Sequence, residues 1–289
     1  MVTDRLKSLD VHKVQQIIKW TVYSLLIINW GFYVYEDWTR AAFTLNENST
    51  WFDITTAYAT TLDQLAWFTL LFMFELETYV LEDTNWKTSL AMSAARIVCI
   101  ALIAHTLVAY TQTVINYSKI QPVENATSFC DVADAEVSYV YNLAYTEVTP
   151  ENCASLPETD VVLWAGEIKD QVVATPASLQ LELNLAWADE IEAIVWLLIL
   201  AAIEIVVRMQ DRGIAGGRVI TNLNRLKIGL YAILLTIGVY WASLGHWVYL
   251  WDEILWIGGF AAIEMNLSQW RDEITDETAA EQLQEASHA

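Results

Sequence analysis

Long apolar runs recur along this chain and restrict its possible folds more than any other feature. An α-helix needs about 20 predominantly apolar residues to cross the roughly 30 Å hydrocarbon core of a bilayer. Six runs approach or exceed that length: residues 17–34, 65–81, 97–115, 191–207, 228–250 and 250–267. They predict an all-α integral membrane protein built as a six-helix transmembrane bundle. A hydrophobic content of 55% with 14 tryptophans agrees with this class.

The fifth and sixth runs are nearly continuous, so the number of helices depends on a turn between them. We infer that turn from Gly245, His246, Asp252 and Glu253. Without it, five longer helices would replace the six. The first 16 residues are polar, and the apolar run that follows them is too long for a signal peptide and lacks an Ala-x-Ala site. We therefore expect no cleavable signal peptide.

The basic residues indicate the orientation of the helices, because cytoplasmic loops retain lysine and arginine. Twelve of the 15 fall on one side of the six-helix arrangement, and the other three, Arg40, Lys119 and Lys169, fall on the opposite side. This asymmetry predicts a multi-pass protein of the bacterial inner (plasma) membrane with both termini in the cytoplasm. Its parts would be a cytoplasmic N-terminus (1–16), a membrane domain (17–270) and an acidic cytoplasmic tail (271–289).

A long segment between the third and fourth runs, residues 117–182, contains all four prolines of the chain. Connections of this length usually have a structure of their own, so we expect a small external loop subdomain. Cys130 and Cys153 both fall in it and predict a disulfide in an oxidising compartment, whereas Cys99 falls in a helix. Residues 179–185 alternate like a strand but are also compatible with the first turns of the fourth helix.

The charge distribution limits the partners of the protein. The net charge of −21 arises mostly from the outer loop and the C-terminal tail, and it excludes a nucleic-acid partner. The 208–227 loop on the cytoplasmic side is basic, so we expect it to bind anionic lipid headgroups of the bilayer. The helix pattern is compatible with a monomeric pore and with a homo-oligomer.

Acidic and aromatic residues recur at one spacing in three of the runs. The acid, tryptophan and acid of each set lie four and then eight positions apart: Asp63, Trp67 and Glu75; Glu192, Trp196 and Glu204; Asp252, Trp256 and Glu264. The three preceding runs align a base at one position, namely Lys19, Arg96 and Lys227. This correspondence favours three parallel helical-hairpin repeats related by an axis along the membrane normal. Coincidence among helices rich in tryptophan is the alternative.

The second acid of each set lies deep in its run, where a carboxylate facing lipid costs at least several kcal/mol. A rise of about 1.5 Å per residue puts Glu75, Glu204 and Glu264 at heights compatible with the three bases. The sequence therefore predicts three acid–base pairs, which would either hold the helices together or take part in an ion pathway.

The first acid of each set lies near the outer boundary, where Asp63, Glu192 and Asp252 would form a negative vestibule that concentrates cations. Neighbouring acids, Asp189, Glu190 and Glu253, are expected to be hydrated helix ends.

These residues predict a membrane transport or channel protein that moves a small cation, H⁺ or a metal ion. The outer acids would attract the ion, the inner glutamates would bind or relay it, and the bases would set their pKa or act as a gate. The alternative is a non-transporting scaffold or sensor that binds a partner through the external loop. We expect no enzyme, because the chain has no His-Glu-x-x-His, Walker or Gly-x-Ser-x-Gly motif. Neither a particular metal nor a cofactor is indicated.

Overall fold

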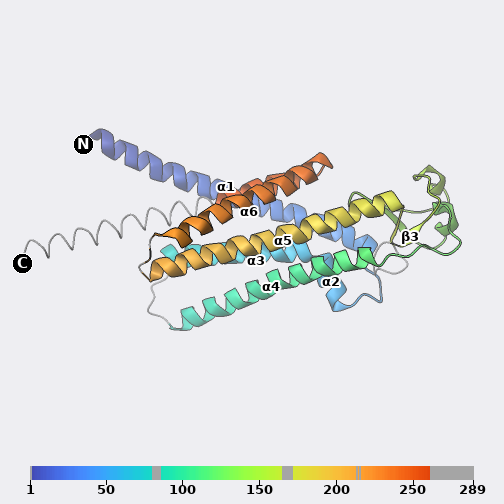
Figure 1. The fold of residues 1–289 in the computed structure, drawn as a ribbon, viewed down its shortest axis with the longest axis horizontal. Coiled ribbons are helices and arrows are strands. Elements are labelled where there is room, and N and C mark those ends of the chain that lie inside the picture. Colours follow the sequence, from blue (N-terminus) through green and yellow to red (C-terminus); the bar gives the residue numbers. More distant parts are fainter. Residues whose placement is uncertain (1, 80–85, 165–171, 213, 215, 261–289) are drawn as a thin grey trace, which may run out of the picture. The chain divides into compact units, whose positions relative to one another are not determined.

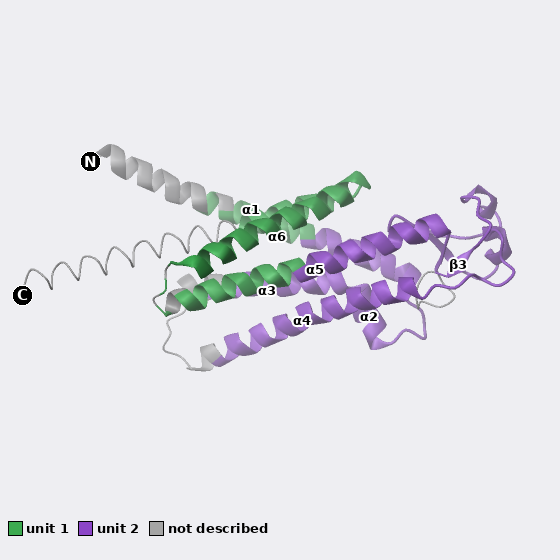
Figure 2. Ribbon diagram, in the orientation of Figure 1, with its two compact units in different colours: residues 1–29, 195–289 green, residues 30–194 purple. Residues whose placement is uncertain are grey.

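A computed structural model describes residues 2–79, 86–164, 172–212, 214 and 216–260 of the chain (Figure 1). The described part is mostly helical, as the sequence predicts. It divides into two compact units: unit 1 consists of residues 1–29 and 195–289, and unit 2 of residues 30–194 (Figure 2).

Unit 2 is built from helices and one small sheet. It contains the last third of α1 (Val2–Thr44), α2 (Trp51–Ala57), α3 (Ala59–Tyr79), α4 (Trp86–Ser118) and the first half of α5 (Pro176–Asp211). Helix α3 packs against α4. Helix α2 begins with a capping box in which Asp53 N donates to Thr50 Oγ1 at 3.3 Å and Thr50 N donates to Asp53 Oδ2 at 2.7 Å. These bonds satisfy amides that have no partner within the helix.

Two helices of the described part are long and apolar enough to cross a bilayer, Leu90–Ser118 and Arg218–Ser243. Only 17% and 33% of their most apolar windows are buried inside the structure, whereas the core helix of a soluble protein is mostly buried. This exposure supports an association with the membrane. Two such helices are fewer than the six predicted from the apolar runs, and the last run, 250–267, continues past the described residues.

Unit 1 contains α6 (Arg218–Ser243), followed by a turn and a helix that is described from residue 247 to residue 260. Gly245 in the turn has a φ of 99°, a conformation that glycine adopts without the steric penalty of a Cβ. The Gly245 amide donates to Ala242 O and the His246 amide to Trp241 O, both at 3.0 Å. The turn inferred from the sequence is therefore present, and the two apolar runs form two separate helices.

Helix α6 and the 247–260 helix pack closely at Gly238. Among the described glycines, Gly238 leaves the least room for a Cβ. A Cβ at this position would lie 2.9 Å from Leu250 Cδ1 and 3.3 Å from Leu250 Cα. The second of these atoms belongs to the backbone and cannot move away by a change of rotamer. Gly229, on the same helix, has nothing within 4 Å of the corresponding Cβ position.

We expect the Gly238→Ala variant to be less stable than the Gly229→Ala variant by about 1–2 kcal/mol, the usual range for overpacking. Both substitutions gain the same helix propensity, so the difference between them isolates the steric effect. Thermal unfolding of the two purified variants in one detergent measures this difference. Equal unfolding temperatures would contradict the close packing at Gly238.

The segment between α4 and α5 forms a four-stranded sheet with two short 3₁₀ turns. Its elements are η1 (Phe129–Val132), β1 (Ser138–Tyr141), β2 (Ala144–Glu147), η2 (Cys153–Ser155), β3 (Leu163–Trp164) and β4 (Val172–Ala174). The strand order is β2-β1-β4-β3, with β1 and β4 parallel and the other two pairs antiparallel. Because α5 already begins at Pro176, residues 179–185 are helical and not a strand. We call residues 119–175 the sheet subdomain.

The sheet subdomain has a hydrophobic core of its own. Phe129, Val137, Tyr139, Val148, Val162 and Val173 are all buried in it. A disulfide joins Cys130 to Cys153, with 4.9 Å between their Cα atoms, and so connects η1 to η2. Tyr145 of β2 stacks on Phe43 near the end of α1, with ring centroids 5.6 Å apart. The subdomain therefore folds around its own core and contacts the helices of unit 2.

Threonines within the helices bond back to their own helix. The side chains of Thr21, Thr69 and Thr236 each donate to the carbonyl four residues earlier, at 2.7, 2.8 and 2.8 Å. All three bonds lie on the surface of the structure.

Candidate functional site

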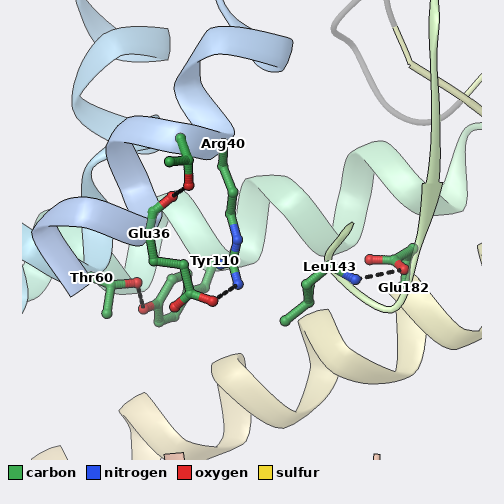
Figure 3. Close-up of polar contacts among 7 residues, drawn as sticks. Glu36, Arg40, Thr60, Tyr110, Leu143 and Glu182 are labelled. Atoms are coloured by element: carbon green, nitrogen blue, oxygen red, sulfur yellow. Dashed lines mark hydrogen bonds and ion pairs between the residues drawn. The ribbon is translucent and has the colours of Figure 1, made fainter. Parts of the chain in front are cut away.

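Acidic side chains from α1 and α5 gather around one arginine in unit 2. Arg40 Nη2 donates to Glu36 Oε1, one helical turn earlier, at 2.6 Å (Figure 3). The charge of Arg40 also acts on Asp37, Glu182 and Asp189. We call Glu36, Asp37, Arg40, Glu182 and Asp189 the Arg40 cluster. Its acids lie beyond the ends of the apolar runs 17–34 and 191–207.

Asp37 is buried between α1 and the start of α3. Only 4% of it is exposed, and its Oδ2 accepts from Thr61 N at 2.9 Å and from Thr61 Oγ1 at 2.7 Å. Burial disfavours the charged form more than these bonds and Arg40 favour it, so the pKa of Asp37 rises from 3.8 to about 6.

Glu182 connects α5 to the hairpin of the sheet subdomain. It is 1% exposed, and its Oε1 accepts from Leu143 N at 3.2 Å (Figure 3). Asn142 and Leu143 form the β1–β2 turn with φ values of 54° and 64°, in a region that residues other than glycine rarely adopt. The second oxygen, Oε2, is buried and has no hydrogen-bond partner in the part of the chain that is described. Burial raises the pKa of Glu182, although the turn amides and Arg40 act in the opposite direction.

Among the acids of the cluster, Asp189 has the pKa that differs most from its ordinary value. Burial raises its pKa from 3.8 to about 7, and the charges of Glu182 and Glu36 add to this increase, while Arg40 opposes it. A carboxyl with such a pKa exchanges its proton near neutral pH.

Helix α4 borders the cluster with polar side chains. Tyr110 Oη lies 3.2 Å from Thr60 Oγ1 of α3 (Figure 3), and the charges of Asp189, Glu192 and Asp63 act on this hydroxyl. The next residue on α4 contacts the acid beside Asp189, since Thr111 Oγ1 donates to Glu190 Oε1 at 3.0 Å. Glu190 is 8% exposed, and its Oε2 is also buried and lacks a hydrogen-bond partner among the described residues.

The structure places the three predicted vestibule acids in different surroundings. Asp63 and Glu192 are half-buried in unit 2 and both act on Tyr110. Asp252 belongs to unit 1, is 5% exposed and accepts from Asn29 Nδ2 at 2.6 Å.

The predicted acid–base pairs remain predictions. Glu204 is exposed and accepts from Arg208 Nε on its own helix at 2.6 Å, a contact that sequence reasoning missed. Lys227 is buried, Lys19 is half-buried and Arg96 is exposed. The side chain of Glu75 and all of Glu264 lie outside the described residues.

One expectation about helix ends was wrong. Glu190 and Glu253 are 8% and 2% exposed, so neither is a hydrated helix end. The sequence places both next to a run boundary, but neighbouring helices cover them. The sequence did not predict four members of the cluster, because they lie outside the apolar runs: Glu36, Asp37, Arg40 and Glu182. The available signal was Arg40, one of only three basic residues on the expected outer side.

No three His, Cys, Asp or Glu side chains among the described residues are grouped so that they could hold a metal ion. Comparison of the chain with protein-family models, with curated proteins and with solved structures gives no match.

Proposed function

We propose that this protein is a six-helix, multi-pass protein of a bacterial plasma membrane that moves a small cation, H⁺ or a metal ion, along carboxylates between its helices. The observation that supports this function is the burial of acids on helices whose outer faces are apolar. Asp37, Glu182, Glu190 and Asp252 are between 1% and 8% exposed. In contrast, Ile28 on α1 and Leu198 on α5 are 69% and 48% exposed. A buried carboxylate is costly to keep ionised, and in membrane proteins such acids often line ion pathways.

Each group of acids has a role in this pathway. Asp63, Glu192 and Asp252 attract the cation at the outer end. Glu75, Glu204 and Glu264 bind or relay it in the inner half. The bases Lys19, Arg96 and Lys227 set the pKa of these acids or act as a gate.

We expect replacement of all three inner acids, Glu75, Glu204 and Glu264, with glutamine to abolish cation flux while the protein still folds. Glutamine has nearly the shape of glutamate but can neither carry the charge nor release a proton. Flux into proteoliposomes, followed with pH-sensitive and metal-sensitive dyes under an imposed potential, measures this effect.

A matched control separates the role of these positions from the loss of three charges. Glu124, Glu151 and Glu158 are exposed in the sheet subdomain. Their replacement with glutamine changes the net charge by the same amount and should leave flux unaltered. Unchanged flux in the inner-acid variant would remove these glutamates from the mechanism.

A second candidate function is a membrane scaffold or sensor that binds a partner through the sheet subdomain. The separate core and the disulfide of this subdomain favour it, because both would keep a recognition surface rigid outside the membrane. Replacing residues 119–175 with a flexible linker distinguishes the two functions. A scaffold loses its partner, whereas a transporter with an intact helical part retains flux.

A further inference from the structure

We propose that the Arg40 cluster is a proton-binding site and that H⁺ is the cation that enters the pathway there. The identification of H⁺ as the transported cation rests on the proposed transport function. The proton-binding site is inferred from the geometry of the described residues alone.

The first argument is an imbalance of charge. The charge of Arg40 acts on Asp37, Glu182 and Asp189, and its guanidinium forms an ion pair with Glu36. Full ionisation would place four negative charges around this one positive charge of the described residues, in a largely buried region. Like charges in a medium of low dielectric constant favour the protonated form of some of their members. The cluster therefore holds protons under conditions in which exposed carboxyls are ionised.

The second argument is independent of the first and concerns one buried oxygen atom. Glu182 Oε2 has no hydrogen-bond partner among the described residues, and Glu182 is 1% exposed. An ionised carboxylate in this position lacks the donors that would replace its water. Binding a proton on one oxygen removes the charge that burial disfavours.

The titratable and charged groups around these acids come from five elements. Helix α1 contributes Glu36, Asp37 and Arg40, and α5 contributes Glu182, Asp189, Glu190 and Glu192. Helix α3 contributes Asp63, α4 contributes Tyr110 and Tyr117, and β2 contributes Tyr145.

Two of these acids have a pKa close to neutral, because burial raises the pKa of Asp37 to about 6 and that of Asp189 to about 7. Burial raises the pKa of Tyr145 to about 12, so its hydroxyl keeps its proton throughout this range.

A proton suits this arrangement because it needs only one oxygen atom. A dehydrated metal ion needs several oxygen ligands that converge on one point. The acids of the cluster come from two helices, α1 and α5. Two of them already accept bonds, Asp37 from Thr61 and Glu182 from Leu143.

The test is an infrared titration of the full-length protein in lipid nanodiscs between about pH 4 and pH 9. We expect a band of protonated carboxyl groups that disappears with a midpoint near 6 to 7, the values for Asp37 and Asp189. The band should weaken in Asp37→Asn and in Asp189→Asn. It should be unchanged in the Glu158→Gln control, since Glu158 is exposed in the sheet subdomain. No near-neutral carboxyl band, or one unchanged by the cluster substitutions, would overturn the inference.

Thermal unfolding across the same pH range gives a second readout. The fold raises the pKa of Asp37 and Asp189 above their ordinary 3.8. The folded state therefore binds protons at these two groups more tightly than the unfolded chain does. Their contribution to stability is complete below about pH 4 and is lost as the pH rises through about 6 to 7. The unfolding temperature of the wild type should therefore fall, relative to that of Asp189→Asn, between pH 5 and pH 8. An identical pH dependence in the two proteins would contradict the site.

Flux measurements then separate this inference from the proposed function. A near-neutral carboxyl band without H⁺ flux or metal flux retains the proton site and overturns transport. Metal flux without such a band retains transport and overturns the proton site. Both hold if the band is present and H⁺ flux is lost in Asp189→Asn.

Discussion

Removal of the disulfide by the double substitution Cys130→Ser and Cys153→Ser should destabilise the sheet subdomain by about 3 kcal/mol. The two cysteines are 23 positions apart, and a crosslink that closes a loop of this size restricts the unfolded chain by about that amount. The subdomain is small, with strands of two to four residues, so its core has little reserve. Hydrogen exchange of the β1–β4 amides should become faster, with little change in α4 and α6.

The third cysteine provides the control for this experiment. Cys99 is a free, buried thiol on α4, outside the subdomain. Its replacement with serine should leave exchange in the sheet unaltered, whatever it does to the stability of the helix. If exchange of the sheet amides in the double variant matches that of the wild type, the disulfide does not stabilise the subdomain.

Replacement of Glu182 with alanine should have the second large effect, a loss of about 2–4 kcal/mol in the contact between the hairpin and α5. The substitution leaves the partly buried Leu143 amide without its acceptor, which costs up to about 1–3 kcal/mol, and removal of the buried Glu182 side chain opens a cavity in addition. The turn is vulnerable because Asn142 and Leu143 adopt positive φ values.

The conservative variant shows which property of Glu182 matters. Glu182→Gln keeps an oxygen that can accept from Leu143 N, so we expect a much smaller loss than in Glu182→Ala. Hydrogen exchange of residues 138–147 reports on the turn. Glu147→Ala, at an exposed position of β2, is the matched control for losing a glutamate from this region. Equal exchange in Glu182→Ala and Glu147→Ala would show that the side chain of Glu182 does not hold the turn.

The helices were predictable from the sequence because their signal is local. Apolar runs mark the middle of α4 and α6, and Gly245 with its polar neighbours marks the turn after α6. The sheet gave no comparable signal, since its strands are too short to show alternation, while residues 179–185 alternate but form a helix. Their helical state is explained by the start of α5 at Pro176, where Thr175 Oγ1 accepts from Ser178 N at 3.0 Å.

The candidate site was only partly predictable because burial of an acid depends on contacts between distant segments. Asp63 and Glu192 were identified from their spacing within the runs. Asp37 becomes buried through Thr61, 24 positions away, and Glu182 through Leu143, 39 positions away. No pattern within one helix reports such contacts. Positions beside a run boundary therefore look hydrated in the sequence even where the fold covers them.

The threonines that bond to their own helices bear on how readily these segments partition into lipid. A hydroxyl in hydrocarbon is costly when it has no partner, but Thr236 Oγ1 already donates to Ala232 O. In a bilayer, such a side chain would present mainly its methyl group to the acyl chains, much as valine does. Thr61 differs, because its hydroxyl donates to Asp37 Oδ2 on another helix. Hydropathy scales assign one value to all threonines and therefore understate the lipid solubility of helices whose hydroxyls are internally bonded.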